Sequence, residues 1–162
     1  MRVTDKYVFF YTWKDFLSNF HSVSFMYKGE LFRNSETALV WMKARYFGAE
    51  DLARRALFSQ TPSTVKTIGR SARLTQHQEE WDKVKGDICY DILLAKFKAP
   101  KMKQLLLETG TRILVEASPT DITWGVGLSQ DDPMIDDPAN WKGENLLGEL
   151  LMRVRDYYSQ YN

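Results

Sequence analysis

The sequence predicts a helix-dominated fold with a small β-sheet, built within about one domain. The segments KYVFFY (6–11) and SVSFMYKGELF (22–32) are rich in β-branched and aromatic residues, which favour strands. From Ser35 onward, most segments carry helical patterns and helix boundary signals. A chain of 162 residues is about one domain long and can bury enough surface to fold without disulfide bonds.

The first third of the chain should contain the sheet. Lys28-Gly29 offers a turn between two short strands within residues 22–32. A further strand is expected at RILVEAS (112–118), which is apolar and partly β-branched.

The segment SETALVWMKARYF (35–47) has the outline of an amphipathic helix capped by Ser35. At about 100° per residue, one narrow sector of this helix contains Glu36, Val40, Lys43 and Phe47. Two interpretations are open. Either the two charged residues are solvated and their stems shield the apolar ones, or the helix lines a wet pocket with this side.

Further helices are expected along the rest of the chain. Thr61-Pro62 is typical of a helix cap followed by proline at the first helical position, and that helix should end near Gly69. The remaining helices are expected at 49–60, 101–110 and 143–161.

Residues 77–99 predict one long core helix. Apolar residues recur in it at spacings of three and four, at Trp81, Val84, Ile88, Ile92 and Ala95. Gly86 is a weak point within it, and Pro100 should end it.

The charge balance excludes a strongly basic surface. Twenty-two Lys and Arg oppose 21 Asp and Glu, so the net charge is +1 and broad electrostatic binding of nucleic acid is not expected, although a small basic patch is allowed. With 14% aromatic residues, the chain can supply flat surfaces to a core or to a planar heterocyclic ligand. One cysteine, Cys89, rules out an internal disulfide framework and predicts cytoplasmic residence. The charged residues among the first 17 predict neither a signal peptide nor a membrane span there.

Neither a metal nor a cofactor is expected. His21 and His77 lie far apart in sequence and leave little for a zinc site. The loop SQDDPMIDDPAN (129–140) lacks the spacing of a calcium loop, although it carries Asp131, Asp132, Asp136 and Asp137.

The densest group of polar and aromatic residues follows the last predicted strand, in VEASPTDITWGVGL (115–128). Glu116 and Asp121 could bind sugar hydroxyls or move protons, and Gly125 beside Trp124 would let the backbone approach a flat ligand. The alternative is structural, with Asp121 capping a turn and Trp124 packed in the core.

Two shorter segments also allow two interpretations. FLSNF (16–20) suits either a tight turn or a site that stacks on a base and binds its edge. In GRSAR (69–73), Arg70 and Arg73 could bind a phosphate, or they could lie at a solvated helix end.

Five segments occur in the order and spacing of one family: LSNF, SETALVWMKARYF, KTIGR, KFKAPKMKQLLLETGTRILVEASPTDITWGVGL and WKGENLLGELLMRVR. Over nearly its whole length the chain resembles the YbiA-like or NADAR family. The most specific features are the paired blocks EAS…D..WG.G and W.G.N.LG..LM..R.

The resemblance implies an α+β, helix-dominated single domain over residues 1–162 that acts as an N-glycosidase on phosphorylated ribosyl compounds. Removal of ADP-ribose from guanine in nucleic acid is the expected activity. The alternatives are hydrolysis of ribosylaminopyrimidine phosphate intermediates of riboflavin synthesis and non-catalytic binding of ADP-ribose. A toxin of the ADP-ribosyltransferase type is a candidate partner, and no membrane association is expected.

Carried over position by position, the resemblance implies catalytic roles for Glu36, Lys43 and Asp121. A carboxylate would transfer a proton, and Lys43 would stabilise charge or attack a ring-opened sugar to form a Schiff base. Such a lysine needs its pKa lowered by burial or by a neighbouring cation. The expected substrate-binding residues are Ser18, Asn19, Phe20, Arg70, Glu116, Trp124, Gly125, Trp141 and Asn145.

Two segments depart from the family pattern. Phe16-Leu17 stands where a proline often precedes SNF, and the residues after Glu36 read TALVWM, with Trp41, where histidine or tyrosine is frequent. The pocket wall is therefore expected to accept a different base.

Overall fold

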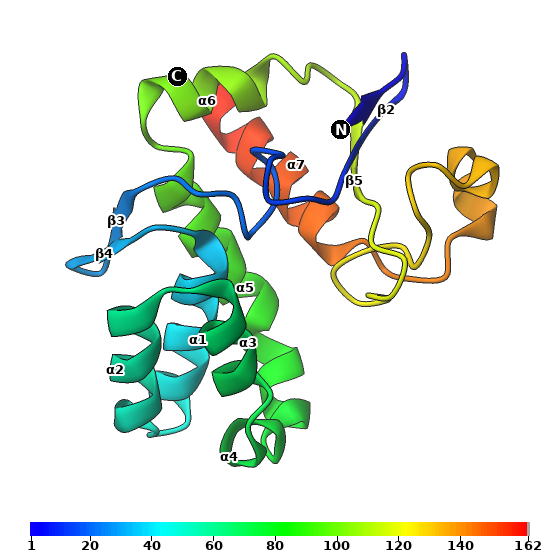
Figure 1. Cartoon of the computed structure of the whole chain (residues 1–162). Helices are drawn as coiled ribbons and strands as arrows, with labels where there is room; N and C mark the ends of the chain where they lie inside the picture. The colour runs from blue at the N-terminus through cyan, green and yellow to red at the C-terminus, as the bar shows by residue number, and fades with distance from the viewer. Residues whose placement is uncertain (162) are drawn as a thin grey trace. The chain divides into compact units, whose positions relative to one another are not determined.

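Helices dominate residues 1–161, which are the residues that the computed structural model describes (Figure 1). Two small sheets accompany the seven α-helices of this part of the chain, so the predicted α+β, helix-dominated class is confirmed. The chain divides into two compact units, which we call the terminal unit (Met1–His21 and Phe97 onward) and the central unit (Ser22–Lys96). The expectation of one domain over residues 1–162 stays a prediction.

A three-stranded sheet forms the β layer of the terminal unit, in the order β1-β2-β5. Strand β2 (Tyr7–Phe10) is buried along its whole length because it lies between antiparallel β1 (Arg2–Val3) and parallel β5 (Ile113–Glu116). Two parallel strands can pair only through a crossover connection. Here that connection is long, because about a hundred residues separate β2 from β5.

Helix α7 (Leu146–Gln160) packs against strand β5 within the terminal unit. The approach is so close that a Cβ atom on Gly148 would overlap the carbonyl oxygen of Leu114. This unit also contains helix α6 (Pro100–Leu107) and two short 3-10 helices, η1 (Pro133–Asp136) and η2 (Pro138–Asn140).

The central unit begins with a two-stranded hairpin of β3 (Phe25–Tyr27) and β4 (Glu30–Phe32). Lys28 and Gly29 both have positive φ, at 50° and 80°, as a two-residue hairpin turn requires. The predicted turn at Lys28-Gly29 is therefore confirmed, although this hairpin forms its own sheet.

Helix α1 (Ser35–Tyr46) packs against three other helices of the central unit: α2 (Glu50–Ser59), α3 (Pro62–Gly69) and α5 (Gln78–Lys96). The predicted amphipathic pattern is wrong, because most of α1 is buried on every side. The predicted cap is also displaced by one residue. The Asn34 side chain accepts the Thr37 N–H, and Ser35 is the first helical residue.

The helix boundaries after α1 agree with the sequence signals in part. Pro62 occupies the first turn of α3, which ends at Gly69 as expected. Helix α5 stops at Lys96, and Pro100 begins α6 instead of ending a helix that runs to residue 99. Four residues also form a separate helix, α4 (Ala72–Thr75). Within residues 1–161, no helix has both the length and the apolar character that crossing a membrane demands.

Candidate functional site

Lys43 and Lys96 are both buried in the central unit, and Lys43 is the one to which the family resemblance gives a catalytic role. Helix α1 holds it at 8% exposure, with Nζ 5.6 Å from the centroid of the Trp81 ring on α5. Among residues 1–161, no carboxylate forms an ion pair with this ammonium. Burial lowers the pKa of Lys43 below its ordinary value, because the charged form loses water. Lys43 is thus an amine that deprotonates more easily than a solvated lysine.

Asp82 is the carboxylate that most raises the pKa of Lys43, but its own partners lie on α5. Its Oδ1 accepts hydrogen bonds from Lys85 Nζ and Gln78 Nε2, both at 2.7 Å. These bonds, led by that from Lys85, lower the pKa of Asp82. Lys85 also acts on Lys43 as a second cation and lowers its pKa. Lys85 and Gln78 therefore bind the carboxylate that would otherwise be the natural ion-pair partner of Lys43.

Glu36 lies two turns before Lys43 on α1 and is half-buried. Its charge raises the pKa of Lys43, so the acid and the amine interact electrostatically. Elsewhere on the same stripe, Val40 lies against Gly69 of α3, and the Phe47 ring stacks on His77 with centroids 4.4 Å apart. The apolar members of the stripe therefore contact neighbouring segments of the central unit and are not merely shielded by charged stems.

The two arginines of GRSAR have different environments. Arg70 is exposed at the C-terminal end of α3. Arg73 binds the Asp51 carboxylate through two hydrogen bonds of 2.6 and 2.8 Å. This pair holds the pKa of Asp51 down at about 2. Arg73 is thus occupied by a carboxylate, and Arg70 alone keeps the predicted role of binding a phosphate.

Trp41, the residue that departs from the family pattern, is buried at 5% exposure in the central unit. Its ring contacts Phe32 and Tyr27 edge to face, and Arg45 lies over it. These contacts make Trp41 part of an aromatic core, so they do not support the expectation that it changes the wall of a pocket.

In the terminal unit, Asp121 orders the loop that follows β5. Its Oδ1 accepts the backbone N–H groups of Thr123 and Trp124, at 2.9 and 2.8 Å. Ser118 Oγ in turn accepts the N–H of Asp121. Asp121 therefore caps a turn, which is the structural role that the sequence left open for it. Trp124 is half-buried beside it.

Close packing within the protein accounts for Gly125. A Cβ there would lie 2.8 Å from the carbonyl oxygen of Glu116 and 3.1 Å from that of Asp121. The loop also binds the start of α7, because Leu147 N–H donates to the Trp124 carbonyl. The glycine thus lets the loop fold against β5. Glu116, at the end of β5, is half-buried.

Asn145 and Trp141 both bind the backbone of the terminal unit. The Asn145 side chain accepts the N–H of Glu116 and donates to the carbonyl of Leu114, which fixes the start of α7 to β5. Trp141 Nε1 donates to the Ile135 carbonyl, and its ring meets Tyr7 edge to face. Both residues therefore have structural contacts, and their predicted roles in substrate binding stay predictions.

The segment FLSNF forms a turn in the terminal unit, as one of its two interpretations proposed. His21 N–H donates to the Ser18 carbonyl, and Phe20 N–H donates to Ser18 Oγ. Ser18 and Asn19 are buried, and Phe20 is half-buried.

The aspartates of loop 129–140 also have local roles. Asp132 and Asp137 accept backbone N–H groups at the starts of η1 and η2, and Asp136 pairs with Arg2 at 2.6 Å. These bonds give Asp132, Asp136 and Asp137 structural roles.

The predicted site residues fall into two groups. The central unit carries Glu36, Lys43 and Arg70, and the terminal unit carries the other nine. Sequence reasoning missed Asp82 and Lys85, and it took Trp81 only for a core residue. The one available signal was the i,i+3 spacing of Asp82 and Lys85 on a helix. That spacing gives no indication of the contact with α1.

Comparison with known proteins gives the same family over both units. The NADAR domain model matches residues 2–158. Protein irg-1 of Caenorhabditis elegans is 37% identical over 127 residues, which are 77% of this chain and 60% of that protein. N-glycosidase R617 of Acanthamoeba polyphaga mimivirus is 33% identical over 169 residues, covering 97% of this chain and 99% of the viral protein. The NMR structure of the Escherichia coli protein YbiA superposes with a TM-score of 0.78 at 26% identity, over 99% of this chain and 89% of YbiA. The chain belongs to the NADAR domain family.

Proposed function

We propose that the chain is an N-glycosidase that removes ADP-ribose from ADP-ribosylated guanine in nucleic acid, with Lys43 as the nucleophile. The names of several relatives support glycosidase activity in general. The choice of guanine follows from the family resemblance of the sequence. A toxin that attaches ADP-ribose would supply the substrate, and both enzymes would work in the cytoplasm.

One observation carries the proposal: the Lys43 amine is buried beside Trp81 and has no ion-pair partner among the described residues. A lysine that only stabilises the fold is expected to pair with a carboxylate or to extend into solvent. Lys43 does neither, and burial lowers its pKa. A lysine that must act as a neutral nucleophile requires this environment.

The chemistry begins with the bond between C1 of ribose and the amine nitrogen of the base. The nitrogen lone pair forms a C–N double bond as the bond from C1 to the ring oxygen breaks, and that oxygen takes a proton. The neutral Lys43 amine then adds to C1. The base amine leaves with a proton, which gives an imine between Lys43 Nζ and C1. Water adds to the same carbon, the lysine amine departs, and the free sugar is released.

Glu36 is the group that we assign to proton transfer. It lies on α1 two turns before Lys43, and its charge raises the pKa of that amine, so we assign to it the proton that the amine gives up and that the leaving base receives. One Asp121 carboxylate oxygen already accepts two backbone N–H groups. We therefore assign Asp121 to ordering the loop that presents Trp124.

The remaining predicted residues would bind the two ends of the substrate. Trp124 offers a flat surface for the base, and exposed Arg70 offers a cation for a phosphate. The other predicted binding residues are Ser18, Asn19, Phe20, Glu116, Gly125, Trp141 and Asn145.

Mass spectrometry after incubation with candidate substrates tests the proposal. We expect release of ADP-ribose from an ADP-ribosylated guanine oligonucleotide and from the corresponding nucleoside. Lys43→Met should abolish release, and Glu36→Gln should slow it by about 10²- to 10⁴-fold, the usual worth of a general acid. Lys83→Met, on the exposed side of α5, is the matched control and should leave the rate unchanged.

The same assay separates the alternatives. Cleavage of a ribosylaminopyrimidine phosphate but not of ADP-ribosylated guanine would show that the proposed substrate is wrong and that the protein is nevertheless an N-glycosidase. Binding of ADP-ribose with neither substrate cut would identify a non-catalytic module.

A further inference from the structure

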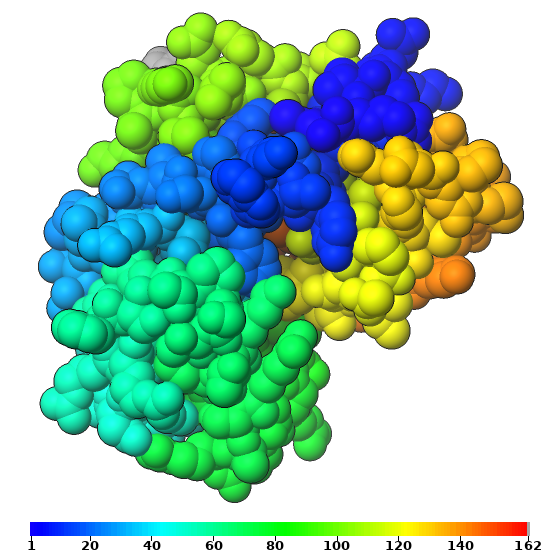
Figure 2. Space-filling model, viewed as in Figure 1, coloured from blue at the N-terminus to red at the C-terminus, as the bar shows by residue number. Residues whose placement is uncertain are grey.

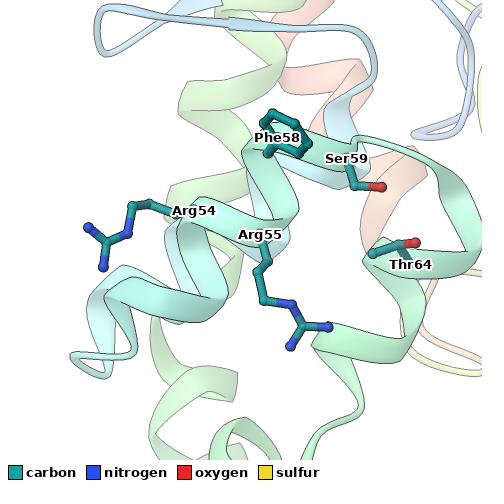
Figure 3. A pocket seen from close by; sticks show the side chains of 5 residues that line it. All are labelled: Arg54, Arg55, Phe58, Ser59 and Thr64. Carbon is teal, nitrogen blue, oxygen red and sulfur yellow. The ribbon is translucent and has the colours of Figure 1, made fainter.

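A shallow hollow of about 430 Å³ lies on the central unit, and none of the residues assigned to catalysis lines it. It is lined by Arg54, Arg55, Phe58, Ser59 and Thr64, which we call the Phe58 face. In Figure 3, Thr64 comes from α3 and the other four side chains from α2. The α2 and α3 segments form part of the molecular surface in Figure 2.

Phe58 is the most unusual residue of this face, because 94% of it is exposed. Burying a phenylalanine side chain normally stabilises a fold, so a ring held almost fully in water has a free surface for a ligand. Its position one turn after Arg54 and Arg55 places an aromatic surface beside two cations.

The two arginines are available to bind an anion. Neither forms an ion pair within residues 1–161. Asp51, one turn before Arg55, is held by both guanidinium hydrogen bonds of Arg73. The lining of the hollow contains no carboxylate, so its charge is positive although the net charge of the chain is only +1.

We propose that the Phe58 face binds a single strand of nucleic acid, with a base stacked on Phe58 and neighbouring phosphates on Arg54 and Arg55. Basic side chains beside an aromatic platform are what a single strand requires, because every base has a π-face and every linkage carries a charge. The two guanidinium groups point in different directions in Figure 3. That arrangement suits two successive phosphates better than one phosphate held by both.

The identity of the bound strand rests on the proposed function, because that strand would be the one that flanks the modified guanine. Helix α2 packs against α1, which carries Glu36 and Lys43. A strand bound at the Phe58 face would thus be held by the same unit as the proposed nucleophile. The binding itself needs neither the modification nor any catalysis.

Fluorescence polarisation with an unmodified, labelled single-stranded DNA oligonucleotide tests the binding. We expect weak, salt-sensitive binding that Phe58→Ala weakens by about fivefold or more, the loss of one stacked base. Arg54→Met/Arg55→Met should lower the slope of log affinity against log salt by about 1.4, as two lost phosphate contacts require.

Two control variants exclude a general effect of charge or exposed aromatic area. Lys98→Met/Lys101→Met removes the same net charge from exposed positions of the terminal unit, and Tyr161→Ala removes another exposed ring. Both should bind the oligonucleotide as the unaltered chain does. Absence of binding, or equal loss in the control variants, would overturn the proposal. Equal binding by the Phe58 face variants would also overturn it.

The catalytic assay distinguishes failure of this inference from failure of the proposed function. On a modified oligonucleotide, the Phe58 face variants should raise KM and leave kcat unchanged, whereas the modified nucleoside should be cut equally well by all proteins. If the oligonucleotide bound in a way that depends on Phe58 but no ADP-ribose was released, the proposed function would be wrong and the proposed binding at the Phe58 face would be supported. If these variants released ADP-ribose from the oligonucleotide with an unchanged KM, the proposed binding of a single strand at the Phe58 face would be wrong, and the proposed function would stand.

Discussion

The surroundings of Lys43 suit an amine nucleophile in two ways: its amine is buried, and the nearby carboxylate of Asp82 is bound by other residues. Its burial on α1 removes water from the ammonium form and so lowers the pKa. Asp82 is the charge that opposes this effect most, and its carboxylate accepts hydrogen bonds from Lys85 and Gln78. We regard Lys85 as a positioning residue, which acts on the substrate only through Lys43.

Lys85→Met should therefore raise the pKa of Lys43. The variant removes a cation that lowers this pKa, and it also releases Asp82 from its charged partner. The pH at which glycosidase activity reaches half of its maximum should move upward with it, because the neutral amine then forms at higher pH. NMR of protein labelled with 13C at lysine Cε measures the titration of Lys43 directly, with Lys43→Arg to assign the signal.

Lys85→Arg keeps the charge and should restore most of the effect, while Lys83→Met on the same helix should leave the titration of Lys43 unchanged. An unaltered or lower pKa of Lys43 in Lys85→Met would show that Lys85 has no such role. A purely structural role of Lys85 would change stability without moving this titration.

The sequence was informative about single residues only where their chemistry is local. The resemblance singled out Lys43 and Glu36, and the turn formed by Ser18 and Phe20 follows from their residue types. The partners of Lys43 were not predictable, because the contact between α1 and α5 joins residues that are about forty positions apart. Similarly, nothing in the sequence separates Arg73, which is bound to Asp51, from exposed Arg70.

Glycine has opposite roles in the two long helices of the chain. Gly86 lies within α5, and a Cβ added there would meet nothing within 4 Å apart from its chain neighbours and the backbone of its own helix, so only its flexibility distinguishes it from alanine. Gly148 lies in the first turn of α7, where a Cβ would overlap both the Leu114 carbonyl and the Asn145 side chain. The first glycine weakens its helix, and the second lets its helix meet β5.

Gly86→Ala should therefore stabilise the protein by about 0.5–1 kcal/mol, the usual gain at an open helical position. Gly148→Ala should destabilise it by about 1–3 kcal/mol, because the added methyl group forces α7 away from β5. Urea unfolding followed by circular dichroism measures both. If the two substitutions changed the free energy of unfolding in the same direction, the packing described for α7 would be wrong.

Helices and the hairpin were the most predictable elements. Proline at the start of α3 and the Lys28-Gly29 turn are local signals, and both hold in the structure. The short strand β1 was missed, because two residues carry too little pattern to be distinguished. The amphipathic pattern expected for α1 fails because three helices surround it, which hydrophobic periodicity in a single segment does not reveal.

Burial also sets how the stability of the protein should depend on pH. Lys96 is almost fully buried in the central unit, and desolvation lowers its pKa to about 7. In the unfolded chain this lysine regains its ordinary value of 10.5, so between about pH 7 and 10 the unfolded state binds more protons than the folded state. The free energy of unfolding should therefore rise with pH across this window.

Urea unfolding of the unaltered chain and of Lys96→Met at several pH values between 7 and 9.5 checks this expectation. The rise should be smaller in Lys96→Met, because the variant has no amine to protonate on unfolding. Tyr27 does not interfere in this window, since burial raises its pKa to about 12. Equal slopes in the two proteins would mean that Lys96 remains charged in the folded state.

The fold class was predictable for the whole chain, but the arrangement of the two sheets was not. The sequence indicated strands early in the chain and again near residue 115, and it placed the sheet in the first third. The structure instead pairs β2 with β5 in the terminal unit and leaves β3 and β4 as a separate hairpin. Parallel pairing across so long a crossover depends on tertiary packing, which no local signal encodes.

Borohydride trapping of the reaction intermediate tests the role of Lys43 most directly. The protein is incubated with an ADP-ribosylated guanine nucleoside and sodium borohydride, and the digest is analysed by tandem mass spectrometry. If Lys43 attacks the sugar, the peptide that contains Lys43 should carry a reduced ADP-ribosyl adduct on Nζ, and Lys43→Arg should carry none. Turnover of the nucleoside with no adduct on that peptide, or an adduct on another lysine, would contradict the assignment of Lys43 as the nucleophile.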